Sequence, residues 1–196
     1  MFEIRLHGRG GQGVVTTAEL LSVAAFRDGR HAQAFPSFGP ERTGAPVTAF
    51  CRIGERPIRG RDPVTHPDAL IVQDASLLHQ VDLFAGLEDD AYLLINSSRG
   101  LGDLGLADFA AGRRPDRLLV VPATTIALDT LGRPLPGTAL LGGFTAVTGE
   151  ISLSAVHAAI ADRFAGAVAE ANHAAAERAY AFGCEEQEKL RHVAAD

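Results

Sequence analysis

Three glycines near the start of the chain, Gly8, Gly10 and Gly13, follow the spacing G-x-G-x-x-G. A short apolar segment, 2–6, precedes them, and a helical pattern begins at Thr17. Glycine at these positions lets a phosphate approach the backbone, and the first turn of a helix offers unpaired N–H groups and the positive end of its dipole. The spacing therefore predicts an anion-binding turn, or a tight strand-to-helix turn that holds no ligand.

A dinucleotide such as NAD needs a second anchor, a carboxylate about 20 residues further on at the end of the next strand. The next apolar segment, 31–35, is followed by Pro36 and contains no acidic residue, and Asp28 comes before it. The NAD interpretation therefore lacks its second anchor. Inside the turn, Arg9 and Gln12 favour a polar ligand or a subunit contact over a turn without function.

A second unusual segment, AQAFPSFGPERTGAPV at 32–47, contains three prolines and two glycines. These residues stiffen the backbone and determine where it turns. The segment carries two aromatic rings, Phe35 and Phe38, and the charged pair Glu41 and Arg42. A rigid loop of this composition suits a fixed contact with a ligand or another chain, and an ordinary crossover loop is the alternative.

Other kinds of chemistry find little support in the residue types. The two cysteines, Cys51 and Cys184, lie far apart and cannot by themselves hold an iron–sulfur cluster or a structural zinc ion. The seven histidines show no convincing metal-pair spacing, and Ser37 is not part of a G-x-S-x-G motif. We therefore assign no metal site and no catalytic residue, and we expect Cys51 to be a core residue of an apolar strand.

The elements that must position the glycine turn alternate between strands and helices, which indicates an α/β fold. We predict a single Rossmann-like domain with a mostly parallel sheet and a helical C-terminal part. Short, nearly continuous apolar runs suit a sheet that is covered on both faces. The predicted strands are 2–6, 31–35, 47–53, 68–73, 91–96 and 116–123, and the predicted helices are 17–26, 74–84, 138–147, 153–164 and 167–182.

Length and charge complete the prediction of one domain, 1–183, with a charged C-terminal tail, 184–196, that wraps a partner or is mobile. The net charge of −6 argues against general affinity for nucleic acid or anionic membranes. We expect a cytoplasmic protein, because no apolar run is long enough to span a membrane and no export signal is recognisable. The arginine-rich stretch at 52–61 suits phosphate contacts or, alternatively, a solvated or ion-paired edge.

The two long loops, in this order and spacing, resemble those of a known family. The stretches GRGGQGVVTTAELLSVAA and AQAFPSFGPERTGAPVTAFCRI are similar to the gamma subunit of the 2-oxoacid:acceptor oxidoreductases, typified by pyruvate:ferredoxin oxidoreductase. The resemblance covers about 4–164. The phrase FPSFGPERTGAP is closer to the pyruvate branch. Gly137 departs from that branch, which usually has Asn in this stretch, so branched-chain 2-oxoacids and phenylglyoxylate stay open as substrates.

The resemblance implies an enzyme that oxidatively decarboxylates a 2-oxoacid, forms acyl-coenzyme A and passes electrons to ferredoxin or to an NAD-reducing subunit. It implies thiamine diphosphate, magnesium and [4Fe–4S] clusters in alpha, beta and ferredoxin-like (delta) partner subunits. For this chain we expect a structural role and phosphate contacts to coenzyme A. A stand-alone NAD(P)-binding enzyme and a ligand-free scaffold are the alternatives. The expected contact residues are Gly8, Arg9, Gly10, Gly11, Gln12, Gly13 and Arg42.

Overall fold

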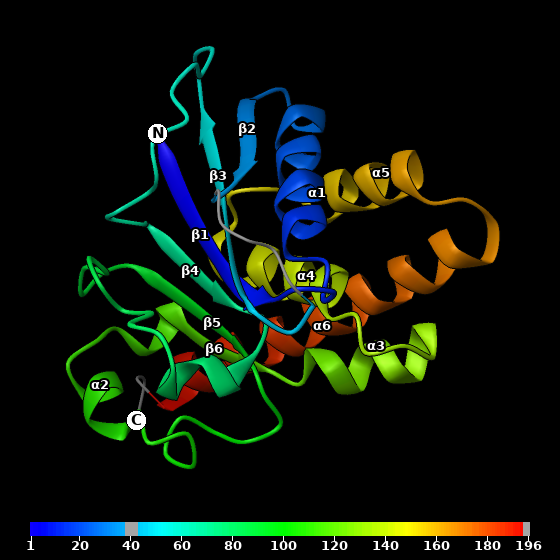
Figure 1. The fold of residues 1–196 in the computed structure, drawn as a ribbon. Coiled ribbons are helices and arrows are strands. Elements are labelled where there is room, and N and C mark those ends of the chain that lie inside the picture. The colour runs from blue at the N-terminus through cyan, green and yellow to red at the C-terminus, as the bar shows by residue number, and fades with distance from the viewer. Residues whose placement is uncertain (38–42, 194–196) are drawn as a thin grey trace.

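A six-stranded sheet lies at the centre of the computed structural model, which describes residues 1–37 and 43–193 (Figure 1). The strand order is β2-β3-β1-β4-β5-β6. The strands are β1 (Phe2–Arg9), β2 (His31–Pro36), β3 (Pro46–Gly54), β4 (Ala69–Val72), β5 (Tyr92–Asn96) and β6 (Leu118–Val121).

One antiparallel strand interrupts an otherwise parallel sheet. β1, β4, β5 and β6 pair in parallel, whereas β3 pairs antiparallel with β1, from Phe2 opposite Ile53 to Arg9 opposite Pro46. β2 in turn pairs antiparallel with β3, so β2 runs in the same direction as β1. The predicted mostly parallel sheet is confirmed, and β3 lies between the two strands that follow each other in a dinucleotide-binding fold.

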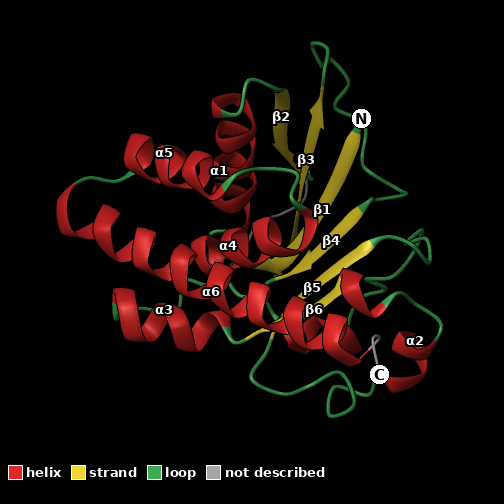
Figure 2. Ribbon diagram, turned by 180° about the vertical axis from the view of Figure 1, so that it is seen from behind, coloured by secondary structure: helices red, strands yellow, loops and turns green. Residues whose placement is uncertain are grey.

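The longer helices lie together on one face of the sheet, as Figure 2 shows. α1, α4 and α6 pack on the strands, with α5 against α1 and α3 against α6. Alternate strand residues such as Ile4, Leu6 and Leu94 point into this layer and are fully buried there. The helices are α1 (Val14–Arg27), α2 (Ala107–Ala111), α3 (Ala123–Leu131), α4 (Gly137–Thr148), α5 (Leu153–Arg163) and α6 (Gly166–Val193).

Small residues bring α4 and α6 into very close contact. A Cβ atom built on Gly142 would lie 2.0 Å from the carbonyl oxygen of Ala176, and one built on Gly183 would lie 2.7 Å from the Cβ of Ala146. The two helices therefore approach nearly backbone to backbone, which glycine and alanine permit and larger residues do not. The predicted apolar helix at 138–147 is confirmed, and its composition follows from this contact.

The opposite face of the sheet is covered by loops, the short α2 and the 3₁₀ helix η1 (Ala75–His79), whereas a second 3₁₀ helix, η2 (Pro115–Arg117), contacts α4 and α6. Leu70 and Val72 of β4 point into this second layer, so both faces of the sheet are covered, as predicted. Buried Arg5 ties the covering loops down, since its guanidinium donates to the carbonyl oxygens of Leu83 (2.9 Å) and Ala85 (2.7 Å).

The predicted helix at 74–84 is wrong beyond its first turn. Asp74 does act as the cap, because its carboxylate accepts a hydrogen bond from the N–H of Ser76 (2.9 Å). Only η1 follows, and the N–H groups of Gln80 and Val81 both turn back to the carbonyl oxygen of Leu77. The hydrogen bonds from Arg5 to the carbonyl groups of Leu83 and Ala85 then hold this part of the chain in turns. Local helix propensity cannot predict such long-range contacts.

The last helix extends beyond its predicted end. We predicted a helix over 167–182, whereas α6 continues without interruption to Val193. The charged residues after Gly183 therefore belong to a regular helix as far as the structure describes them, and the division of the chain into a module and a tail stays a prediction. Neither α6 nor any other helix in the described ranges is long and apolar enough to cross a membrane.

Candidate functional site

The glycine turn has a conformation that requires glycine at two positions. Gly11 (φ +94°) and Gly13 (φ +74°) both adopt the left-handed backbone region. β1 ends just before the turn, where the N–H of Gly10 donates to the carbonyl of Ala45 (2.9 Å) and the N–H of Gly44 donates back to Gly10 (3.0 Å). The turn and the end of the proline-rich segment are thus joined directly.

Close packing explains why the residue at position 8 is glycine. A Cβ atom at this position would lie 2.6 Å from Cγ2 of Val14 and 3.1 Å from Cβ of Gln73. The absence of a side chain therefore lets the start of α1 sit close to the ends of β1 and β4. Gly8 and Gly13 of the motif thus do what a strand-to-helix turn needs, whether or not a ligand binds.

Arg9 and Gln12, which the sequence suggested as ligand contacts, are held by other residues of the chain. The guanidinium of Arg9 donates to Ser76 Oγ (2.7 Å), to the Gly44 carbonyl (2.9 Å) and to Gln80 Oε1 (3.0 Å). Gln12 accepts from the N–H of Arg9 (2.8 Å) and donates to Asp74 (2.7 Å). Because Arg9 lies two and four positions from His7 and Arg5 on β1, its side chain lies on the face of the sheet opposite α1.

These contacts also act on Asp74. Burial alone would raise its pKa, but hydrogen bonds from Ser76 and Gln12 and the positive charge of Arg9 together hold that pKa below its ordinary value. The carboxylate is therefore ionised and joins η1 to the turn. Arg9 and Gln12 therefore fix the shape of the turn, Gln12 also lines the cavity described below, and the predicted contacts of both residues with a ligand stay predictions.

The N-terminus of α1 opens into a cavity of about 660 Å³. Thr17 is the first residue whose N–H bonds within the helix, to Gly13, so the amides of 14–16 have no intrahelical partner. No side chain caps this end of the helix, and the first turn contains no acidic residue. Gly11, Gly13 and Thr16 line the cavity, so this positive end of the helix dipole faces an open space.

Two arginines that the sequence did not point to border the same cavity. Arg133 follows α3 and Arg163 ends α5, and both are exposed. In the described ranges, neither forms an ion pair or donates a side-chain hydrogen bond. Leu20, Leu131 and Phe164 contribute an apolar wall between them. Only the fold brings these residues to the glycine turn, because they are more than 100 positions away and belong to no recognisable motif.

A polar network holds the carboxyl ends of β1, β4 and β5 beside this cavity. The side chain of Gln73 donates from Nε2 to Thr17 Oγ1 (2.9 Å), and the main-chain carbonyl oxygen of Gln73 accepts from Asn96 Nδ2 (2.8 Å). Gly137, the position that departs from the pyruvate branch, begins α4 here. A Cβ atom at Gly137 would lie 2.3 Å from Thr17 Oγ1, so any side chain there would displace this hydroxyl.

The proline-rich segment is only partly described. Phe38, Glu41 and Arg42 lie outside the described residues, so the predicted contact of Arg42 stays a prediction. Phe35 does not project from the segment: its ring is buried against Phe50 at a centroid distance of 5.3 Å. The segment therefore brings one aromatic ring into the core and returns to the glycine turn at Gly44.

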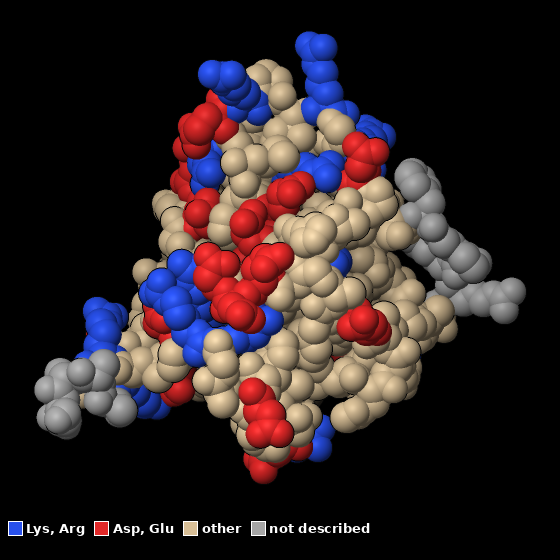
Figure 3. Space-filling model, turned by 90° about the vertical axis from the view of Figure 1, so that its left-hand side faces the viewer, with Lys and Arg blue, Asp and Glu red and all other residues tan. Residues whose placement is uncertain are grey.

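The arginine-rich stretch after β3 does not reach the glycine turn. Arg52 lies opposite Glu3, near the start of β1, about 20 Å along the strand from Arg9. Its guanidinium is paired with Glu3 (2.6 Å) and donates to the carbonyl groups of Gly60 and Asp62. Figure 3 shows basic side chains projecting at the top of the molecule, with acidic side chains among them, where Figure 1 places the loop after β3. A shared phosphate site with the turn is therefore excluded.

Cys51 has the role predicted for it. It is fully buried in β3, and burial raises the pKa of its thiol, so it is an inert core residue. Across residues 1–37 and 43–193, no three histidine, cysteine or acidic side chains come together in a way that could hold a metal ion.

Comparisons with known proteins agree with the resemblance seen in the sequence. The profile of the family described as pyruvate ferredoxin/flavodoxin oxidoreductase matches residues 3–182. The chain is 48% identical to the pyruvate/ketoisovalerate oxidoreductases common subunit gamma of Pyrococcus abyssi, over 92% of this chain and 96% of that one. It is also similar to the crystal structure of the pyruvate oxidoreductase subunit PORC of Thermotoga maritima, with 36% identity, a TM-score of 0.77, and coverage of 92% and 95% of the two chains.

A third protein shows the fold alone. The 2-oxoglutarate:ferredoxin oxidoreductase of Magnetococcus marinus, solved with 2-oxoglutarate, coenzyme A and succinyl-CoA bound, matches 96% of this chain with 31% of its own, at 16% identity and a TM-score of 0.67. In that protein the fold forms part of a longer chain. By the family profile and the 48% identical relative, this chain belongs to the pyruvate ferredoxin/flavodoxin oxidoreductase family, as the gamma (PorC) subunit of a multisubunit oxidoreductase.

Proposed function

We propose that this gamma subunit supplies no catalytic residue and helps to bind coenzyme A at the cavity beside the glycine turn. The observation that carries the proposal is the uncapped N-terminus of α1, which opens into a cavity bordered by Arg133 and Arg163. A helix N-terminus and two arginines without ion-pair partners in the described ranges suit a ligand with several phosphate groups. The positive charge gathers here although the chain as a whole is acidic.

The rest of the cavity also suits coenzyme A. That molecule joins a pyrophosphate and a ribose phosphate to a long, largely apolar arm. Leu20, Leu131 and Phe164 offer an apolar wall to such an arm, and Thr16 and Asn172 offer polar groups. The solved 2-oxoglutarate:ferredoxin oxidoreductase that shares the fold binds coenzyme A, which supports the same class of ligand here.

The strand order argues against NAD in the same turn. In a dinucleotide site the second strand lies beside the first and ends in a carboxylate that binds the ribose. Here β3 separates β2 from β1, which moves the end of β2 about 10 Å from β1. β2 also ends in Pro36 instead of an acidic residue. Both requirements of the ribose contact are missing.

We further propose that thiamine diphosphate, magnesium and [4Fe–4S] clusters are held by alpha, beta and delta partner subunits, with ferredoxin or an NAD-reducing subunit as electron acceptor. The two cysteines support this division, because Cys51 is buried in β3 and Cys184 lies on α6, away from any cysteine neighbour in sequence. For the substrate we propose pyruvate or a branched-chain 2-oxoacid, after the name of the Pyrococcus relative.

The assembled enzyme with Arg133→Ala and Arg163→Ala tests the coenzyme A proposal. A charge-assisted hydrogen bond contributes about 1.5 kcal/mol, so each substitution is expected to raise the KM for coenzyme A about tenfold. The KM for the 2-oxoacid should not change. Arg61→Ala is the matched control, since Arg61 is an exposed arginine at the other end of the sheet.

Three results are informative. A selective rise in the KM for coenzyme A supports the proposal. An unchanged KM in the double variant would refute the site and leave the ligand-free scaffold as the better description. Micromolar NAD binding by the isolated chain, lost in Gly13→Val, would instead revive the dinucleotide interpretation.

A further inference from the structure

β6 is an edge strand, and one side of its backbone meets no other strand. The N–H of Ser97 donates to the carbonyl of Val121 (3.0 Å), so Val121 and, two residues earlier, Leu119 direct their main-chain groups at β5. The N–H and C=O of Val120 therefore point away from the sheet. In the ranges 1–37 and 43–193, neither group has a hydrogen-bond partner on that side.

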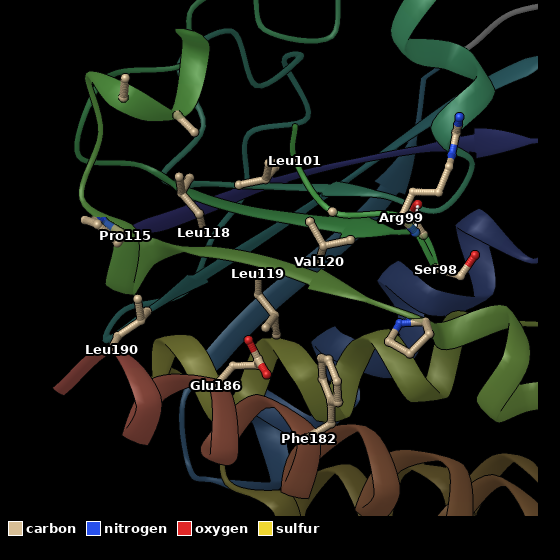
Figure 4. Close-up of a pocket in the computed structure, with 15 residues that line it drawn as sticks. Ser98, Arg99, Leu101, Pro115, Leu118, Leu119, Val120, Phe182, Glu186 and Leu190 are labelled. Atoms are coloured by element: carbon tan, nitrogen blue, oxygen red, sulfur yellow. Dashed lines mark hydrogen bonds between the residues drawn. The ribbon is translucent and has the colours of Figure 1, made fainter. Parts of the chain in front are cut away.

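A groove of about 670 Å³ runs along this free edge. Figure 4 shows Val120 on one side of the strand and Leu119 on the other, facing Phe182 of α6. One wall of the groove consists of Phe182, Glu186 and Leu190, which recur every four residues and so share one face of α6. The groove thus has a hydrogen-bonding floor and a mainly apolar wall.

The rest of the lining of the groove is also mainly apolar, with polar side chains and polar contacts near its ends. Leu101 and Arg99 belong to the loop after β5, and Arg99 forms no ion pair in the described ranges. Gln187 donates from Nε2 to the carbonyl of Asp116 (2.8 Å), which fixes α6 at the start of β6. Arg99 lies at one end of the groove, and the carboxylate of Glu186 lies between Phe182 and Leu190 along the α6 wall, where it also pairs with Lys189 (2.6 Å).

β6 is short, as many edge strands are, but its residues carry none of the other usual protections of a sheet edge. Its sequence, LLVV, contains no charge, no proline and no bulge, and no strand covers it within the described residues. An apolar edge with free main-chain groups accepts an extended segment that adds a strand to the sheet. We propose that β6 pairs with an extended segment of a partner subunit, with apolar alternate side chains, a basic residue facing Glu186 and an acidic residue facing Arg99.

A second copy of this chain fits the groove less well. Pairing of β6 with β6 of another copy about a twofold axis would place the two α6 helices side by side. Their C-terminal halves carry Glu185, Glu186 and Glu188 against Lys189 and Arg191, and Lys189 already pairs with Glu186 (2.6 Å). Like charges would then face each other, whereas a single extended strand brings no second helix.

This inference rests on the chain being a subunit of a larger enzyme and does not depend on the coenzyme A proposal. The test is to measure the rate of hydrogen exchange at the Val120 amide by mass spectrometry. The rate in the free full-length chain is compared with the rate in the co-expressed complex. We expect exchange to slow at least about tenfold on assembly, because the amide gains a partner. The same rate in both states would overturn the proposal, as would protection that arises from self-association of the free chain.

Two sets of variants test the contact separately. Val120→Pro removes the outward N–H and leaves the β5–β6 hydrogen bonds, so it should weaken co-purification with the partner subunits about tenfold. The Tm of the free chain shows whether the variant folds. Glu186→Arg should weaken assembly, whereas Glu185→Arg, on the exposed side of α6, should not. Equal assembly of the two charge variants and of wild type would contradict the proposed orientation. The KM for coenzyme A should not change in complexes that do assemble.

Discussion

Gly142 and Gly143 are neighbours in α4, and we predict different consequences when each is changed to alanine. In a solvent-exposed helix, either change would stabilise the helix by about 1 kcal/mol. In this fold a Cβ at Gly142 would lie 2.0 Å from the carbonyl oxygen of Ala176 in α6. A Cβ at Gly143 would lie 3.2 Å from Cγ2 of Val121 and 3.4 Å from Cδ2 of Leu119, which are ends of side chains.

The size of the Gly142→Ala effect follows from these distances. An ordinary contact between carbon and a carbonyl oxygen is about 3.3 Å, so α4 and α6 must separate by about 1 Å. Overpacking of this kind costs about 1–3 kcal/mol, and the separation also loosens the other small residues along the contact. Because the clash is with backbone atoms, we take the upper end of this range, and after the gain of about 1 kcal/mol in helix propensity we expect a net loss of about 2 kcal/mol. Gly143→Ala should stay within about 1 kcal/mol of wild type, because the side chains that it meets can move.

Urea unfolding of the full-length chain, followed by circular dichroism, measures both free energies. For a protein of this length the expected loss corresponds to a Tm lower by about 4–8 °C. The comparison of the two variants separates the backbone contact from helix propensity, which is the same for both. If Gly142→Ala proved as stable as Gly143→Ala, the close contact between α4 and α6 would be refuted.

Two further changes test buried groups on the other face of the sheet. Burial and the charge of Arg5 lower the pKa of His7 to about 4, so on acidification the unfolded chain binds a proton at this histidine before the folded chain does. The free energy of unfolding should therefore fall by about 2 kcal/mol between pH 7 and 5. In urea unfolding, His7→Gln should show a smaller fall than wild type, and the control His31→Gln, at an exposed position, should show the same fall as wild type. Arg5→Met leaves the carbonyl groups of Leu83 and Ala85 without their donor, so it should lower the free energy of unfolding by about 3 kcal/mol and speed proteolysis of the loop at 80–90. The control Arg61→Met should change neither the free energy of unfolding nor the rate of proteolysis.

Patterns within one segment predicted much of this fold. The apolar runs around Leu70, Leu94 and Leu119 are strands because each is short and lacks proline and glycine, and those around Leu70 and Leu94 are buried on both faces. Ser152 begins α5 as predicted, because its hydroxyl accepts from the N–H of Ala155 (3.1 Å). The glycine turn was also recognisable, since positive φ angles at Gly11 and Gly13 exclude most other residues.

Features that depend on distant residues could not be predicted in this way. Nothing in the periodicity of 46–54 says that β3 inserts between β1 and β2, because strand order depends on where the connecting segment leads. Arg9 was expected to face a ligand, yet its partner Ser76 is 67 positions away. Arg133 and Arg163 carry no local pattern at all, and they reach the glycine turn only because α3, α5 and α6 pack together.

The two proposed sites lie at different positions along α6. Asn172 lines the cavity beside the glycine turn, whereas Phe182 lines the groove along β6, about 15 Å further along the helix. Between them α6 packs closely on α4, so the helix is fixed over the stretch that separates the sites. A change at Glu186 should therefore act on assembly and a change at Arg163 on coenzyme A, each without the other. Gly142→Ala differs from both, because moving α6 away from α4 displaces one wall of each site together.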